Sequence, residues 1–381
     1  MRRGLGGSLG LKGGPPKFEH SMTGRASAGG LKMNREKRSR TKPLGSRENL
    51  TSIAGSSGAR SVLVAGGAGF LGAELCKRYL HKGFDVTCLD DLSSGRLVNL
   101  EEHLSHPGFT FIRQDVAKPL QLESSFQYIF NLACPASPPR YQADPLQTLK
   151  TCLYGAFNLL ELARVSGARI LQASTSEVYG DPNVSPQKES YTGNVNTFGP
   201  RSCYDEGKRA AETIFHDYHE CHGVDLRVAR IFNSYGPGMD PLDGRVVSNF
   251  ITQALQGEPL TVFGDGSQTR SFCYLDDTVD GLIALMHSPP SEFEPVNIGN
   301  PRETPVGELA ELVLKKIHST SRLTYRDLPQ DDPKRRRPDI NRARTRLGWE
   351  PKVNLSDGLD RTIGYFRNEL AAAGKCVPGA V

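Results

Sequence analysis

The sequence lacks any long hydrophobic stretch, and it lacks a regular cysteine pattern. A membrane-spanning helix needs about 20 consecutive apolar residues, and no run in this chain approaches that length. The eight cysteines form no CxxC pair and no even spacing, which argues against both a disulfide framework and a zinc site. These absences predict a cytoplasmic protein with reduced thiols, without a transmembrane anchor and without a bound metal.

Negative charge is scarce at the N-terminus. Residues 1–60 hold 13 Lys/Arg against 3 Asp/Glu, whereas the whole chain has a formal net charge of only +5, so the rest is mildly acidic. This stretch has 12 glycines and no apolar periodicity, so it cannot bury enough surface to offset its ordering entropy. We therefore expect a disordered basic tail over 1–60 and a flexible C-terminus over 371–381. The basic run 34–42 favours a solubilising leader over contact with anionic lipid or nucleic acid, and no nucleic acid is required.

Short apolar runs alternate with helical patterns in the next part of the chain. The runs at 61–65, 85–90, 109–112, 128–133, 169–174 and 225–230 are typical of strands buried in a parallel sheet. Long helical patterns cover 148–166 and 204–222. This alternation predicts an α/β fold, a Rossmann-type doubly wound parallel sheet that binds NAD, over 61–235. The pattern then loosens, so 236–370 is expected to form mainly a smaller substrate-binding lobe.

A glycine-rich turn, Gly66 to Gly72, follows the first apolar run and precedes a helix. Glycines at this spacing let the backbone approach a pyrophosphate whose charge lies at the helix N-terminus. Asp90 ends the next strand, where a carboxylate accepts hydrogen bonds from ribose hydroxyls and repels a 2′-phosphate, so NAD is favoured over NADP. Arg96 weakens that preference without reversing it. The residues predicted to bind NAD are Gly66, Gly69, Phe70, Leu71, Gly72, Asp90, Asp91, Ser94, Gly95, Asp115, Val116, Leu132, Tyr204 and Lys208.

Tyr204 and Lys208 lie four residues apart, well beyond the glycine turn. Positions i and i+4 share one face of a helix, so Lys208 is expected beside the Tyr204 hydroxyl. A neighbouring cation favours phenolate and lowers the pKa of a tyrosine. The pair predicts a general base that takes a proton from a sugar hydroxyl while a nicotinamide accepts hydride. The alternative is a core tyrosine near a solvated lysine.

Three segments together resemble the extended short-chain dehydrogenase/reductase family that acts on nucleotide sugars. They are Gly66–Gly72, Ser174–Gly180 and the pair Tyr204/Lys208, and the resemblance covers roughly residues 60–370. Within that family, four longer runs are similar to the UDP-glucuronate decarboxylases, also called UDP-xylose synthases. These runs are 131–139, 199–208, 243–250 and 331–339.

The resemblance implies an NAD-dependent, redox-neutral decarboxylation of UDP-glucuronate to UDP-xylose and CO2. Tyr204 would remove the C4 hydroxyl proton while NAD takes the hydride, which gives a 4-keto uronate. This β-keto acid loses its carboxylate because the ketone accepts the electrons as an enolate. Protonation at C5 and return of the hydride complete the cycle, so NAD is expected to stay tightly bound. Family members also pair helices, here 148–166 and 204–222, across a homodimer.

The segment 175–177 is where the resemblance places the reacting C4 oxygen. Thr175 and Ser176 can donate hydrogen bonds to that oxygen as it gains charge. Glu177 is a candidate acid/base, and the alternative is a carboxylate held in an ion pair. Related dehydratases carry an Asp-Glu pair at 176–177, whereas epimerases usually lack the carboxylate, so this segment favours decarboxylation.

UDP and the uronate carboxylate together bring about three negative charges, so several cations must converge on the substrate. The resemblance assigns this role to Lys150, Asn233, Arg245, Arg270 and Arg336. A solvated cationic face remains the alternative for Arg336, because it lies in the basic run 334–337.

Four positions depart from the family pattern, and they leave fine sugar specificity open. Cys134 stands where Ser is common, Arg140 and Cys152 where Asn is common, and Gly238 where Arg is common. Three other functions also stay open: a nucleotide-sugar 4-epimerase, a 4,6-dehydratase and a non-catalytic NAD-binding scaffold.

Overall fold

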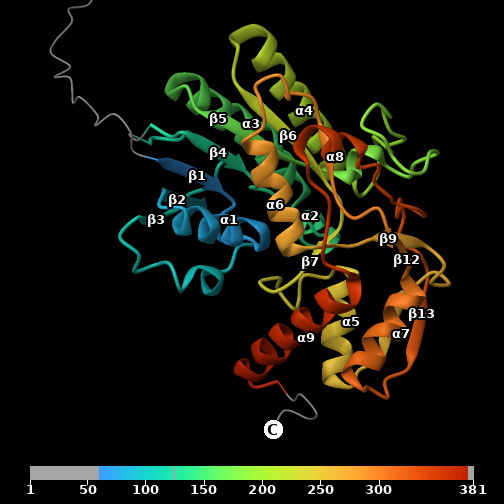
Figure 1. Ribbon diagram of the computed structural model, residues 1–381. Coiled ribbons are helices and arrows are strands. Elements are labelled where there is room, and N and C mark those ends of the chain that lie inside the picture. Colours follow the sequence, from blue (N-terminus) through green and yellow to red (C-terminus); the bar gives the residue numbers. More distant parts are fainter. Residues whose placement is uncertain (1–59, 123–124, 376–381) are drawn as a thin grey trace, which may run out of the picture. The chain divides into compact units, whose positions relative to one another are not determined.

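The computed structural model describes residues 60–122 and 125–375 (Figure 1). The tail expected over residues 1–60, with its basic run 34–42, lies outside the described residues up to position 59, as do the last residues 376–381. Within the described ranges, no helix combines the length and the apolar character that crossing a membrane requires.

Seven parallel strands form one sheet, in the order β11-β6-β5-β4-β1-β2-β3 (Figure 1). The strands are β1 (Ser61–Ala65), β2 (Asp85–Asp90), β3 (Phe109–Arg113), β4 (Tyr128–Asn131), β5 (Arg169–Thr175), β6 (Leu226–Ile231) and β11 (Val296–Ile298). This order, with its reversal between β1 and β4, confirms the predicted Rossmann-type α/β fold.

Helices cover both faces of this sheet. The α-helices of the described residues, including those that do not contact the sheet, are α1 (Phe70–His81), α2 (Pro138–Ala143), α3 (Pro145–Ser166), α4 (Ser202–His222), α5 (Val246–Gln256), α6 (Leu275–Met286), α7 (Val306–Ile317), α8 (Asn341–Leu347) and α9 (Leu355–Ala372). α1 and α6 share a core with Val62 and Val64, whereas α3 and α4 share one with Leu63 and Ala65. Because successive side chains of a strand point to opposite faces, a sheet covered on both sides needs a continuous apolar run such as β1.

The helix predicted over 148–166 begins earlier than expected, at Pro145. Asp144 caps it, because its side chain accepts a hydrogen bond from the backbone nitrogen of Gln147 at 2.9 Å. Proline is well placed as the first helical residue, since the nitrogen there needs no partner. The capping signal was present in the sequence, but the apolar periodicity that predicted the helix begins only after it.

The C-terminal part of the chain packs α5, α7 and α9 around a separate hydrophobic core. Three short strand pairs accompany these helices: β7 (Ser234–Tyr235) with β10 (Cys273–Tyr274), β8 (Leu260–Phe263) with β13 (Leu323–Arg326), and β9 (Thr269–Ser271) with β12 (Glu303–Pro305). The stretch 236–370 was expected to be mainly a lobe of its own. It also supplies the strand β11 to the large sheet and the helix α6, which packs against that sheet. The part of the chain after β6 therefore contributes both to the large sheet and to the C-terminal core.

Candidate active site

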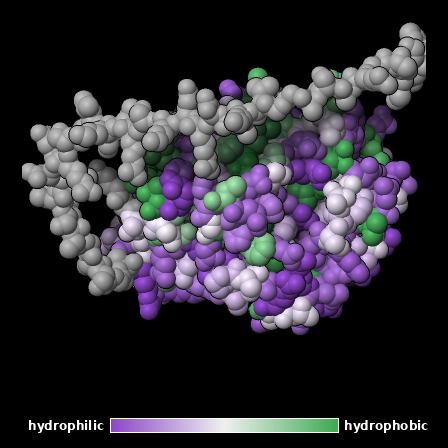
Figure 2. Space-filling model, turned by 90° about the horizontal axis from the view of Figure 1, so that it is seen from above, coloured by the Kyte–Doolittle hydropathy of each residue, from purple (hydrophilic) through white to green (hydrophobic). Residues whose placement is uncertain are grey.

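A cavity of about 580 Å³ lies at the carboxyl ends of the central strands. Its lining comes from the glycine turn after β1, the ends of β4, β5 and β6, and the segments 233–250, 261–272 and 329–336. The face of the molecule in Figure 2 is largely hydrophilic and shows hydrophobic residues in smaller areas. Doubly wound sheets bind ligands at this edge, where the strand order reverses.

The glycine turn forms a backbone cradle at the N-terminus of α1. A Cβ at Gly72 would collide with the carbonyl oxygen of Gly66, and a Cβ at Gly66 would lie 2.8 Å from the backbone nitrogen of Ala133. Gly66 also has a φ of +78°, which other residues rarely adopt. The close approach and the helix N-terminus suit the pyrophosphate of a dinucleotide.

Asp90 holds this cradle against the loop that follows β2. Its carboxylate accepts hydrogen bonds from the backbone nitrogens of Ala68 at 3.0 Å and Leu92 at 2.8 Å. Burial raises the pKa of Asp90, and these two hydrogen bonds offset part of that effect. A contact between Asp90 and a ribose stays a prediction.

Most of the residues predicted to contact NAD line the cavity. These are Gly66, Gly69, Phe70, Leu71, Gly72, Ser94, Leu132, Tyr204 and Lys208. Asp90, Asp91, Gly95, Asp115 and Val116 are not in the lining. Val116 is buried in the core below α3, and Asp115 accepts a hydrogen bond from Gln147 at 3.1 Å. Their predicted contacts with adenine stay predictions.

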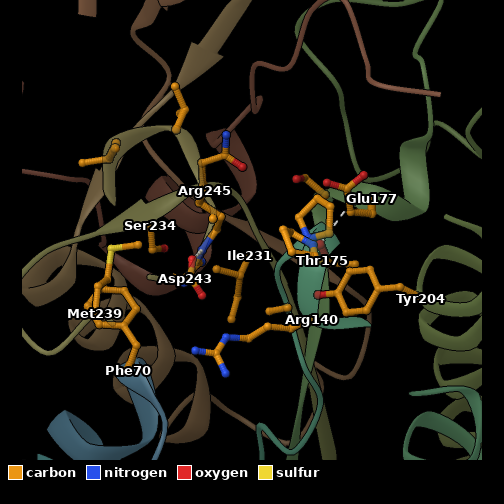
Figure 3. A pocket seen from close by; sticks show the side chains of 18 of the residues that line it. Phe70, Arg140, Thr175, Glu177, Tyr204, Ile231, Ser234, Met239, Asp243 and Arg245 are labelled. Carbon is orange, nitrogen blue, oxygen red and sulfur yellow. Dashed lines mark hydrogen bonds and ion pairs between the residues drawn. The ribbon is translucent and has the colours of Figure 1, made fainter. Parts of the chain in front are cut away.

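Tyr204 and Lys208 are both buried in α4 and line the cavity, and Figure 3 shows the Tyr204 side chain there. The Lys208 ammonium lies 5.8 Å from the centre of the Tyr204 ring and donates a hydrogen bond to the Ala173 carbonyl at 2.9 Å. Burial raises the pKa of Tyr204 well above its usual value, whereas a hydrogen bond with Thr175 lowers it. The lowering expected from Lys208 is therefore not realised, because burial outweighs it and the ammonium is directed at a carbonyl.

Two residues that the sequence did not single out surround Tyr204. The Tyr141 ring stacks on the Tyr204 ring with centroids 4.9 Å apart and planes 5° from parallel. The Tyr141 hydroxyl and the Asp205 Oδ1 are buried and have no hydrogen-bond partner among the described residues. Burial, followed by the charge of Glu177, raises the pKa of Asp205 to about 8, although Arg201 and Arg336 act in the opposite direction.

Glu177 lies between two guanidinium groups. Its Oε2 accepts from Arg201 at 2.9 Å, and its Oε1 accepts from Arg336. Burial alone would raise the pKa of Glu177, but these two arginines lower it to about 2. This carboxylate is therefore ionised at neutral pH and has no proton to donate. The arrangement matches the ion-paired alternative and places Arg336 in the cavity, not on a solvated face.

A second carboxylate, Asp332, joins two of the buried arginines. It accepts hydrogen bonds from Arg270 at 2.7 Å and from Arg201 at 3.4 Å. Arg201, Arg270 and Arg336 are each less than one-tenth exposed. Arg201 and Arg336 both keep a buried Nε donor without an acceptor among the described residues. The cavity therefore holds donors suited to a further anion.

Two further ion pairs line the cavity. Arg245 donates to Asp243 and lies over the Phe70 ring, 6.0 Å from its centre. Arg140 of α2, labelled in Figure 3, donates to Asp240, which follows β7. Gly238 also lines the cavity and has no side chain, so the arginine that is common at this position is missing. Arg140 supplies a cation to the same cavity.

Asn233 lines the cavity with the three predicted arginines, but Lys150 does not. Lys150 is exposed on α3, two residues from the buried Thr148 and Cys152. Residues two apart on a helix do not share a face, so burial of the neighbours turns Lys150 away. A contact between Lys150 and the substrate is thus unsupported.

Arg201 and Asp332 are the clearest residues that the sequence analysis missed. Both lie in runs already noted for their family resemblance, 199–208 and 331–339, which was the available signal. Their pairing joins segments 131 residues apart in the chain, and no local pattern reveals such a contact.

Comparison with known proteins agrees with this geometry. Residues 62–299 match the NAD dependent epimerase/dehydratase family. The chain is 52% identical over 311 residues to UDP-glucuronic acid decarboxylase 1 of Xenopus tropicalis, which covers 82% of this chain and 73% of that protein. Its fold is similar to UDP-glucose 4-epimerase of Thermotoga maritima with UDP-glucose, at a TM-score of 0.75 and 31% identity over 81% of this chain and 99% of that one. It is also similar to UDP-glucuronic acid 4-epimerase of Bacillus cereus in complex with UDP-glucuronic acid and NAD, at a TM-score of 0.73 and 26% identity over 81% and 99% of the two chains.

Proposed function

The chain belongs to the NAD dependent epimerase/dehydratase family, and on that premise we propose that it converts UDP-glucuronate to UDP-xylose and CO2. The observation that carries the proposal is the buried cluster of Arg201, Arg270 and Arg336 in the same cavity as Tyr204. The three guanidinium groups face only two carboxylates of the chain, Glu177 and Asp332, so the cluster keeps a net positive charge that suits a uronate linked to a diphosphate.

The cofactor half of the cavity fits NAD. The glycine cradle admits a pyrophosphate, and the Asp90 carboxylate at the end of β2 disfavours a 2′-phosphate. When bound, NAD supplies a reversible hydride acceptor. The protein itself orients the reacting hydroxyl and moves its proton.

Tyr204 is the proposed proton acceptor for the C4 hydroxyl. Thr175 hydrogen-bonds its hydroxyl, and Lys208 places positive charge near the ring as the phenolate forms. Since burial raises the pKa of Tyr204, deprotonation depends on the charge that these neighbours and the cofactor contribute. Thr175 and Ser176, both buried at the end of β5, are placed to donate hydrogen bonds to the C4 oxygen as it becomes a ketone.

Arg336 and Glu177 are proposed to orient the uronate carboxylate. Arg336 has a donor to spare, and Glu177 fixes its guanidinium from one side. A carboxylate next to a C4 ketone leaves as CO2 because the ketone oxygen takes up the electron pair. The ionised Glu177 keeps a second negative charge near the departing carboxylate, which favours loss of a neutral molecule.

Product analysis tests this proposal directly. Purified protein incubated with UDP-glucuronate, without added NADH, should give UDP-xylose and CO2 by NMR. Formation of UDP-galacturonate without CO2 would instead establish an epimerase, and conversion of UDP-glucose, which has a C6 hydroxyl to lose, to a 4-keto-6-deoxy sugar would establish a dehydratase. If no nucleotide sugar turns over while NAD remains bound, the scaffold alternative gains.

A cytoplasmic homodimer is a second part of the proposal. Leu146, Tyr154, Phe157 and Val165 are exposed apolar residues of α3, on the side that also packs against α4 through Phe157 and Tyr218. The cysteines of the described ranges are all free thiols, which agrees with a reducing compartment. Light scattering at micromolar concentration should show twice the chain mass, and Phe157→Glu should restore the single-chain mass. A monomeric wild type would refute the dimer.

A further inference from the structure

Two cysteine sulfurs lie against each other at the edge of the candidate active site. The Sγ atoms of Cys134 and Cys152 are 3.4 Å apart. Cys134 follows β4 and borders the cavity, whereas Cys152 lies on α3 and is buried. Both positions depart from the residues that are common in the related proteins, so the pair is a property of this chain.

The pair lies directly below the Tyr204–Lys208 face of α4. A Cβ at Gly207 would lie 3.1 Å from both the Cβ and the Sγ of Cys152, so α3 and α4 touch at this point. A negative charge on either sulfur would raise the pKa of Tyr204, with the larger effect from Cys134. The sulfurs are therefore coupled to the proposed proton acceptor both by packing and by charge.

The hydrogen bond with Cys152, together with burial, raises the pKa of the Cys134 thiol well above its usual value, so Cys152 is the sulfur on which the surroundings favour a thiolate. The hydrogen bond from Cys134 lowers the pKa of Cys152 against the effect of burial, and the charge of Lys208 lowers it further. Thiolate is the form of cysteine that reacts with peroxides and disulfides. A second sulfur within contact distance can then capture the oxidised one before it reacts further.

We propose that Cys134 and Cys152 form an oxidisable dithiol that closes reversibly to a disulfide and switches the enzyme off. One sulfur, as thiolate, attacks hydrogen peroxide and becomes a sulfenic acid with loss of water. The other sulfur then attacks the sulfenic sulfur and a second water leaves. Overall, two thiols and one peroxide give one disulfide and two waters, and a dithiol reductant reverses the change.

Bond formation must move the sulfurs together by roughly 1.4 Å, from 3.4 Å to about 2.05 Å. The movement draws the loop after β4 toward α3, beneath Lys208 and beside the glycine cradle that contacts Ala133. A displacement of about 1 Å in a catalytic constellation lowers turnover on the order of 100-fold. We therefore expect at least a tenfold loss of turnover in the oxidised protein.

The experiment treats the purified full-length protein with a slight excess of hydrogen peroxide and follows two readouts. Intact mass should fall by about 2 Da, the two hydrogens lost, and peptide mapping should find the link between Cys134 and Cys152. Turnover of UDP-glucuronate should fall and return after dithiothreitol. The mapping does not depend on the proposed function, so a protein without decarboxylase activity still tests the disulfide.

Matched variants isolate the pair. Cys152→Ser, compared with its own reduced form, should form no such link and should keep its turnover under peroxide. Cys203→Ser, at a nearby half-buried cysteine, should respond like the wild type. An unchanged mass, a link between other cysteines such as the core residues Cys76 and Cys88, or a disulfide that leaves turnover unchanged would each overturn the proposal.

Discussion

The two sides of the cavity differ in how they treat charge: one side pairs buried ions with one another, and the other side surrounds Tyr204 with buried, mostly uncharged groups. On the ionic side, Glu177 and Asp332 are each held by two arginines, and the pKa of Glu177 falls to about 2. The other side, formed around Tyr204 and Tyr141, is named the dry side. Burial there raises the pKa of Tyr204, and the Tyr141 hydroxyl has no partner among the described residues. The chain thus builds its anion site from its own charges but leaves its proton acceptor neutral. The contrast suggests that the substrate is held by the protein, whereas the oxidation depends on the cofactor as well.

The largest expected effect comes from the dry side. Tyr204→Phe removes the proposed proton acceptor and should lower kcat by about 10³-fold or more. Substrate affinity, measured by calorimetry, should change little because the arginines remain. Tyr141→Phe is the matched control, since it removes the stacked neighbour's hydroxyl only, and it should cost far less. Equal losses for the two variants would remove the distinction between acceptor and neighbour.

Removing one arginine from the ionic side should mainly lower the stability of the fold. Arg336→Gln leaves Glu177 buried with only Arg201 and should lower the free energy of unfolding by about 3–5 kcal/mol. Adding Glu177→Gln removes the buried carboxylate that has lost one of its two arginines, so the double variant should recover part of that loss. Denaturant titration should be done on four proteins: the wild type, the two single variants and the double variant. Strict additivity of the two single changes would show that the pair is not coupled.

The two sides should also respond to pH in opposite directions. Asp205 has a pKa of about 8 in the folded protein against an ordinary 3.8, so its contribution to stability is complete below pH 3.8 and is lost as the pH rises toward 8. Glu177, with its lowered pKa, instead contributes above pH 4.5 and loses that contribution as the pH falls toward 2.

Asp205→Asn tests this difference. Its unfolding free energy relative to the wild type should rise by a few kcal/mol between pH 5 and pH 8, because only the wild type must bury an ionising carboxyl. Glu177→Gln is the control and should show no such rise over this range. A flat difference for Asp205→Asn would mean that Asp205 ionises normally.

The smallest effect concerns the ion pair between Arg140 and Asp240, which is partly exposed and so contributes below about 1 kcal/mol. Asp240→Asn removes a negative charge from the cavity and should lower the KM for UDP-glucuronate a few-fold, whereas Arg140→Asn should raise it. Steady-state kinetics at two salt concentrations would check both, since screening should shrink the changes. Shifts of KM in the same direction would contradict a role in anion binding.

The sequence predicted the first six strands and the cofactor turn well, because each carries a local signal. The strand predicted over 128–133 ends at Asn131, and β11 escaped notice because it is only three residues long and lies far from its neighbours in the chain. Arg336 was identified through resemblance. Arg201, which also donates to Glu177, and the contact between Cys134 and Cys152 were not identified, since long-range side-chain pairs leave no periodic pattern in the sequence.

The central claim is a cycle in which oxidation at C4 is undone after CO2 leaves. UDP-glucuronate carrying deuterium at C4 tests it most directly, because a hydride that leaves and returns keeps its label. We expect UDP-xylose that retains deuterium at C4, with no accumulation of reduced cofactor. UDP-xylose with hydrogen at C4, or deuterium that accumulates on the cofactor, would contradict it.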